Sequence, residues 1–133
     1  MIAAQQISLV FGVLVLFYGL FLGVPTGQER ATARQANEHL VNTHLSSLMM
    51  GSMHMGLTYA IGFAAGSTTL LAIAAILSVV GSGFITIGGS LNWIMKADDQ
   101  FAEKSPGYMF NAAGGPPSLI GAGIITVAVI VGL

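Results

Sequence analysis

The chain has 133 residues and no cysteine, and only 7% of its residues are charged, with a formal net charge of −1 at pH 7. Soluble domains carry about 25% charged residues, so this composition excludes an ordinary soluble domain. The near-neutral charge argues against a nucleic-acid partner, which requires a basic face, and the lack of cysteine excludes disulfides, iron–sulfur ligation and thiol catalysis within this chain.

The charged residues are confined to two short windows, 29–38 and 96–104, and the rest of the chain contains no Asp, Glu, Lys or Arg. A charge at the centre of a bilayer costs at least ~2.5 kcal/mol, so a membrane explains this distribution. The apolar stretches also lack the intramembrane acid that proton pumps and ion-coupled transporters usually need. The sequence therefore predicts an integral membrane protein of another kind.

Four apolar segments set the number of membrane crossings: residues 7–24, 44–65, 68–95 and 117–133. A helical crossing needs about 20 residues, whereas a membrane barrel would show segments of about 10 residues that alternate apolar and polar. Backbone groups in lipid must be satisfied within the segment, which favours helices. We expect an all-α fold, a single transmembrane domain over residues 1–133 that forms a four-helix bundle.

The first span is followed by a polar loop over residues 25–43. No Lys or Arg precedes this span and no small-residue cleavage site follows it, so we expect a retained helix rather than a signal peptide. Residues 28–37 are rich in helix formers. We therefore expect the second helix to begin near Thr26 or Gln28, as an extension in water that continues into the membrane.

The second span and its entrance carry all three histidines, His39, His44 and His54. Ionisable groups inside a membrane are candidates for functional sites. His44 and His54 are ten residues apart, which corresponds to about 15 Å of rise and about 280° of rotation on a helix, so they do not share a face. Each imidazole is therefore either a separate ligand or a structural residue bonded to a neighbouring helix.

Small side chains follow His44 at helical spacing, at Ser47, Gly51 and Thr58. A haem with one axial histidine needs a nitrogen ligand with a flat clearance beside it, and this stripe offers both. A second metal hypothesis concerns His54, which is surrounded by Met49, Met50, Met53 and Met55. Thioethers and imidazole suit Cu(I), although methionine is also an ordinary filler of cores.

The third span is rich in small residues, with Gly81, Ser82, Gly83, Gly88, Gly89 and Ser90 in ten positions. Small residues allow close helix packing in lipid, and this run also offers room for a flat cofactor or substrate. Asn92 and Trp93 end the span. Trp93 is an expected interface anchor, and the amide of Asn92 can orient a ligand or cap the turn.

The loop before the fourth span contains two groups of helix breakers, Ser105-Pro106-Gly107 and Gly114-Gly115-Pro116-Pro117. Between them, residues 108–110 are apolar, and we expect them either to fold back from a loop as a cap over the bundle or to lie in the membrane interface. With four crossings, the first and third loops lie on one side and carry all four basic residues. The positive-inside rule places these loops in the cytoplasm and both termini outside.

The whole chain resembles the styrene oxide isomerase family, which are four-helix bacterial membrane enzymes. The shared pattern is an apolar first helix with a glycine-rich end, a histidine that enters the second helix, and a glycine seven residues later, here His44 and Gly51. A glycine-rich third helix and a loop with Ser-Pro and Gly-Pro follow, here Ser105-Pro106 and Gly115-Pro116. The resemblance implies a bacterial inner-membrane protein.

The resemblance also implies a homotrimer that binds haem b between neighbouring subunits, with His44 as the axial ligand and metal-binding residue. Gly51 would lie beside the haem, and Arg30 or Arg34 would meet its propionates at the membrane surface. In the family, ferric iron acts as a Lewis acid that opens a small apolar epoxide and yields an aldehyde after a hydride shift.

Two departures from the family concern its catalytic groups. Met50 stands where the family has an asparagine, and the third span has no tyrosine, so that Leu91 or Asn92 falls nearest to that position. Haem binding depends on His44 and survives these changes, whereas isomerisation would have to use Asn92 as its catalytic residue. A non-catalytic accessory subunit of a membrane complex and a copper-binding membrane protein are the alternative functions.

Overall fold

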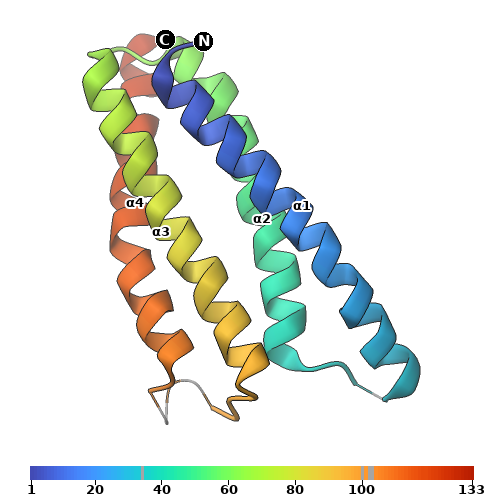
Figure 1. Cartoon of the computed structure of the whole chain (residues 1–133). Coiled ribbons are helices and arrows are strands. Elements are labelled where there is room, and N and C mark those ends of the chain that lie inside the picture. The colour runs from blue at the N-terminus through green and yellow to red at the C-terminus, as the bar shows by residue number, and fades with distance from the viewer. Residues whose placement is uncertain (34, 100, 102–103) are drawn as a thin grey trace.

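The computed structural model describes residues 1–33, 35–99, 101 and 104–133. Over this part of the chain it contains four α-helices and one short 3-10 turn, with no strand (Figure 1): α1 Ala3–Thr32, α2 Glu38–Ala60, η1 Ile61–Phe63, α3 Thr68–Ile94 and α4 Pro106–Gly132. The helices run alternately down and up, so both termini lie at one end and the loops after α1 and α3 lie at the other (Figure 1). The predicted all-α membrane bundle is confirmed.

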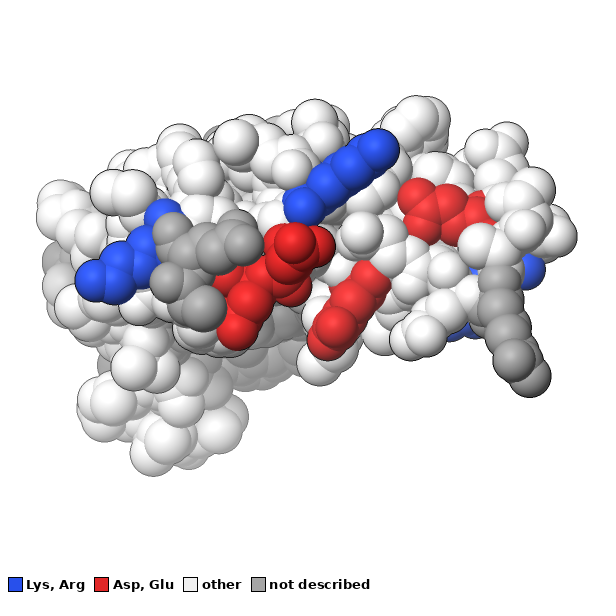
Figure 2. All heavy atoms as spheres, turned by 90° about the horizontal axis from the view of Figure 1, so that it is seen from below, with Lys and Arg blue, Asp and Glu red and all other residues white. Residues whose placement is uncertain are grey.

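The surface of the bundle matches a bilayer. α1, α3 and α4 are long and apolar enough to cross a membrane, and large side chains such as Phe17, Leu119 and Ile130 lie exposed on their outer faces. Figure 2 shows the acidic and basic side chains gathered at the loop end of the molecule. α2 does not reach the same apolarity, because it carries the imidazoles and several hydroxyls, and it contacts α1 and α3.

The expectation that the second helix begins near Thr26 or Gln28 is wrong, because these residues belong to α1, which continues to Thr32. α2 begins only at Glu38. Asn37 caps it, with a side-chain oxygen that accepts from the amides of His39 and Leu40, as Asn does at helix starts. The Glu29 carboxylate accepts from the Asn37 amide at 2.7 Å and so closes the connection between the two helices.

The predicted loop over residues 97–117 is also wrong in its second half, because α4 already begins at Pro106 and includes residues 108–110. Ser105 caps this helix by accepting from the Tyr108 amide at 3.1 Å, and Pro106 occupies the first turn, where a missing N–H costs nothing. Pro116 and Pro117 lie inside the helix. Their lost backbone hydrogen bonds are offset by the packing of this helix against α3.

The packing of α3 against α4 depends on glycines that repeat every seven residues: Gly81 and Gly88 on α3, and Gly107, Gly114 and Gly121 on α4. A Cβ on Gly81 would collide with the backbone of Ser118, and one on Gly88 with the Gly107 carbonyl. A seven-residue repeat keeps one seam in register along two helices that supercoil. The two backbones therefore lie in direct contact along most of their length.

A second seam of the same kind joins α1 to α2. A Cβ on Gly12 would lie 3.0 Å from the Gly51 carbonyl oxygen, and a Cβ on Gly19 would lie 2.9 Å from the Leu48 amide nitrogen. The bundle is thus two glycine-seamed hairpins. Between the hairpins several contacts are polar, as in the 2.7 Å hydrogen bond between the Tyr18 and Ser90 hydroxyls and the 2.8 Å contact between the His39 ring and the Ala97 carbonyl.

The seam between α3 and α4 predicts a difference between two adjacent glycines. A Cβ on Gly114 would lie 2.5 Å from the Gly81 carbonyl oxygen, whereas a Cβ on Gly115 meets no atom within 4 Å. Gly114→Ala should therefore destabilise the protein by about 1–3 kcal/mol through overpacking. Gly115→Ala, with the same gain in helix propensity, should be neutral or stabilising. The apparent melting temperature in detergent measures both, and equal effects would contradict this packing.

Candidate functional site

His44 lies on the face of α2 that packs against α1, and its ring is held by a backbone group. The Nδ1 atom is 2.7 Å from the carbonyl oxygen of Gly19. A carbonyl only accepts hydrogen bonds, so Nδ1 must carry the proton, and in the neutral ring Nε2 then carries the lone pair. The fold of the α1–α2 hairpin therefore sets both the orientation and the tautomer of this imidazole.

The Nε2 atom of His44 is available to a ligand. It makes no hydrogen bond with the part of the chain that the structure describes, and it is not among the fully enclosed polar atoms. Gly23 adjoins the ring, since a Cβ there would lie 3.3 Å from Cε1 of His44. A histidine that binds a metal through one nitrogen almost always donates its other N–H to a carbonyl or carboxylate, as His44 does.

The clearance that the sequence predicts at Gly51 is filled by α1. A Cβ on Gly51 would lie 2.6 Å from the Leu16 amide nitrogen, and Ser47 is fully buried. Gly51 therefore packs two helices together and leaves no flat space below His44. Gly23 of α1, a residue that the sequence alone does not connect with His44, gives room for the imidazole ring itself.

Arg30 is exposed in the last turn of α1, seven residues after Gly23 and therefore about 10 Å along the helix axis. It lines a polar cleft of about 420 Å³ at the charged end of the bundle, together with Gln35, Glu38 and Asn42. This places a guanidinium at the membrane surface, on the same helix as the glycines that border His44. Arg34, the other predicted partner of an anionic group, lies outside the described residues.

Asn92 is buried between α3 and α4, where its side chain contacts the start of α4. The Ser105 hydroxyl donates to its side-chain oxygen at 2.6 Å, and Gly107 packs directly against its side chain. His44 instead lies in the other hairpin, against α1. The structure does not bring the two residues together, so the predicted catalytic role of Asn92 has no support in this geometry.

The predicted copper ligands do not converge either. His54 is fully buried toward α3, with Nε2 3.1 Å from the Ser82 hydroxyl, whereas Met49 is 73% exposed on the outer face of α2. Met53 and Met55 are also exposed. No group of three or more metal-ligating His, Cys, Asp or Glu side chains occurs among the described residues. A haem does not need such a group, because the porphyrin supplies four of the iron ligands.

Tyr18 is a residue that the sequence analysis missed. It directly precedes Gly19, whose carbonyl holds His44, but it points to α3, where its hydroxyl lies 2.7 Å from Ser90. The Ser90 hydroxyl donates to the Thr86 carbonyl, so the Tyr18 hydroxyl is the donor of this pair. Both hydroxyls line a cleft of about 380 Å³ that is otherwise mainly apolar. The only signal in the sequence is a phenol inside a long apolar run.

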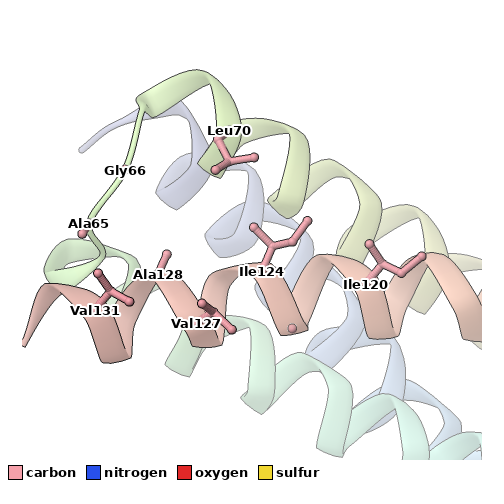
Figure 3. Close-up of a pocket in the computed structure, with 9 residues that line it drawn as sticks. Ala65, Gly66, Leu70, Ile120, Ile124, Val127, Ala128 and Val131 are labelled. Carbon is pink, nitrogen blue, oxygen red and sulfur yellow. The ribbon is translucent and has the colours of Figure 1, made fainter.

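Another cleft lies at the opposite end of the bundle and has an apolar lining. Figure 3 shows this cleft between the start of α3 and the end of α4. It has a volume of about 520 Å³ and is lined by Leu70, Ile120, Ile124, Val127 and Val131 beside Gly66. These side chains offer neither a titratable group nor a hydrogen-bond donor. The groove is suited to hydrocarbon, and we do not place an active site there.

Comparison with protein-family models, with curated proteins and with solved structures found no match for this chain. The functional argument therefore rests on the residues and their geometry.

The contact between Asn92 and Ser105 predicts a coupled loss of stability. Asn92→Ala and Ser105→Ala should each cost about 1–3 kcal/mol, because each leaves the other polar group buried without this partner, and Ser105→Ala also removes a helix cap. The double variant should cost less than the sum of the two, since they share one hydrogen bond. Thermal unfolding of the four proteins measures the coupling, and strictly additive effects would contradict it.

Proposed function

We propose that this protein is a haem b-binding membrane protein similar to styrene oxide isomerase, with His44 as the axial ligand. The observation that carries the proposal is the state of the imidazole: Nδ1 is bonded to the Gly19 carbonyl and Nε2 has no partner among the described residues. This is the arrangement of a metal-ligating histidine with its orienting group. The resemblance to the family adds the haem and a trimeric assembly.

Each residue near His44 has a physical task in this proposal. The Gly19 carbonyl holds the ring in one orientation and fixes the proton on Nδ1. Gly23 lets the imidazole lie against the backbone of α1, because a Cβ there would lie 3.3 Å from Cε1 of His44. Arg30 offers a positive charge at the surface for a carboxylate such as a propionate, and it does so with the bidentate geometry that suits carboxylates.

Ferric haem, when bound, supplies a Lewis acid that can polarise an epoxide oxygen and favour its opening to an aldehyde. The chain's own contribution to a substrate site is the cleft at Tyr18 and Ser90. Its apolar walls suit a small apolar molecule that enters from the bilayer, and its hydroxyls can hold the one polar atom of such a molecule. Tyr18 thereby takes the place of Asn92 as the polar group that we propose for this chemistry.

We place the protein in the bacterial inner membrane, with the loops at the charged end in the cytoplasm. Arg30, Arg34, Lys96 and Lys104 are the four basic residues of the chain, and all belong to these loops or to the helix ends next to them. The positive-inside rule favours this orientation.

A non-catalytic accessory subunit is the second candidate function. It is favoured by Gly115 and Gly123 of α4, where an added Cβ would meet no atom within 4 Å. Small residues on an outward face let another transmembrane helix approach closely. In that case the protein would be colourless and would co-purify with a larger partner, and Gly123→Leu would disrupt this association without unfolding the bundle.

The haem assignment predicts the colour of the pure protein. Purified in mild detergent, it should show a Soret band and close to one iron per subunit. His44→Ala should lower the apparent haem affinity by roughly tenfold or more, since even the loss of a group that orients a ligand costs 10–100-fold. The matched control is His39→Ala on the same helix: its Nε2 atom also lies 2.8 Å from a carbonyl oxygen, that of Ala97, but it lies five residues nearer the charged end of the bundle. Full haem content in His44→Ala would refute the assignment.

The role of Arg30 predicts a smaller and salt-dependent effect. Arg30→Gln should weaken haem binding by up to about fivefold at low salt, because an exposed ion pair contributes about 0.2–1 kcal/mol. The difference should shrink as salt is added. Haem titration at two salt concentrations measures it, with Lys96→Gln as a control on the other loop. An identical loss in both variants would show a general charge effect rather than a contact.

A further inference from the structure

The centre of the bundle contains a chain of polar groups that the proposed function does not use. The imidazole of His54 on α2 is fully buried, and its Nε2 atom lies 3.1 Å from the hydroxyl of Ser82 on α3. The Ser82 hydroxyl lies 3.3 Å from that of Ser118 on α4. The Phe11 ring of α1 packs edge-on against the imidazole, with the ring centroids 4.8 Å apart. Side chains from all four helices therefore take part in this group of contacts.

The other ring nitrogen of His54 has no partner among the described residues, although it is fully enclosed. If Nε2 accepts from Ser82, then Nδ1 carries a proton that it donates to nothing. If Nε2 donates to Ser82, then Nδ1 carries a lone pair that accepts from nothing. In both tautomers Nδ1 therefore lacks a hydrogen-bond partner. Buried polar atoms in folded proteins almost always have a protein or water partner.

Two further enclosed hydroxyls without a partner among the described residues, those of Ser8 and Ser78, belong to the two helices, α1 and α3, that contact His54. Ser78 is one helical turn before Ser82, which bonds His54. Ser8 is one turn before Gly12, where a Cβ would lie 3.1 Å from Cβ of His54. Unpartnered polar atoms from α1, α2 and α3 are thus gathered in the same section of the core.

We propose that a water molecule binds in the centre of the bundle, to Nδ1 of His54, and bridges this atom to the hydroxyls of Ser8 and Ser78. Water both donates and accepts, so it satisfies either tautomer and the hydroxyls together. An apolar ligand would leave these atoms unsatisfied, and a metal ion would find one imidazole and no charged group. The short side chains of Ser8 and Ser78 are compatible with a ligand of this size.

The site would couple the two hairpins. Each hairpin is held by direct backbone contact at its glycines, but between the hairpins His54 and Ser82 form a polar contact in the core. A bound water extends this contact to Ser8 on α1 and Ser78 on α3. The interface between the two hairpins would then contain a bound water in the core of a membrane protein.

Water-to-protein magnetisation transfer in NMR tests the proposal on the full-length protein in nanodiscs, with ¹⁵N-labelled histidine and labelled isoleucine methyl groups. The His54 signals are assigned by their absence from His54→Phe. The expected result is transfer from water to the His54 ring. His39, which lies at the charged end, is the positive control, and Ile125, which is fully buried in the apolar cluster, is the negative control.

The proposal would be overturned if the His54 ring received no more magnetisation from water than Ile125 does. It would also be overturned if Nδ1 were found bonded to a backbone carbonyl. A second comparison uses two hydroxyl deletions. Ser78→Ala removes one partner of the water and should reduce the transfer to His54 by at least half. Thr126→Val removes an exposed hydroxyl that bonds the Ala122 carbonyl, and it should leave the transfer unchanged. Equal transfer in both variants would contradict the bridge to Ser78.

Discussion

Direct backbone contact at glycine is the interaction on which the rest of this structure depends. In lipid, a hydrophobic side chain gains little by leaving the hydrocarbon, so helices associate through close packing and hydrogen bonds. Gly81 and Gly114 bring α3 against α4, while Gly12 and Gly51 bring α1 against α2. These seams bring the Gly19 carbonyl to His44 and bury Asn92 against α4. The candidate ligand therefore owes its orientation to helix packing rather than to a loop.

His44 and His54 show how the environment separates two identical side chains on one helix. His44 donates from Nδ1 to a carbonyl and presents Nε2, whereas His54 uses Nε2 for Ser82 and has Nδ1 enclosed. Nε2 of His44 can therefore bind a ligand that approaches from outside the bundle, whereas Nδ1 of His54 can bind only a molecule held inside it. The contrast follows from rotation on α2, which turns His44 toward α1 and His54 toward α3. His54 and Ser82 thereby form a polar contact between two largely apolar hairpins.

The start of α4 was predictable from a signal that the breaker residues obscured. Gly107, Gly114 and Gly121 repeat at a spacing of seven, in phase with one helix that continues through Pro116. Proline and glycine usually end helices because of two costs, the missing N–H and ring clash of proline and the backbone entropy of glycine. In this bundle the tertiary packing compensates for them. The extension of α1 was visible as a helical composition over residues 28–32, but its assignment to the first helix depended on the cap at Asn37.

The sequence by itself determined that the chain is helical and belongs in a membrane, because charge-free segments of this length leave a backbone no other way to satisfy itself in lipid. It also singled out His44. Only the tertiary structure decided which imidazole nitrogen is free, that Leu16 fills the space at Gly51, and that Tyr18 rather than Asn92 offers a hydrogen-bonding group in a cleft. The physical reason is that these properties depend on the rotation and axial offset of one helix against another, and no local pattern within a single helix encodes them.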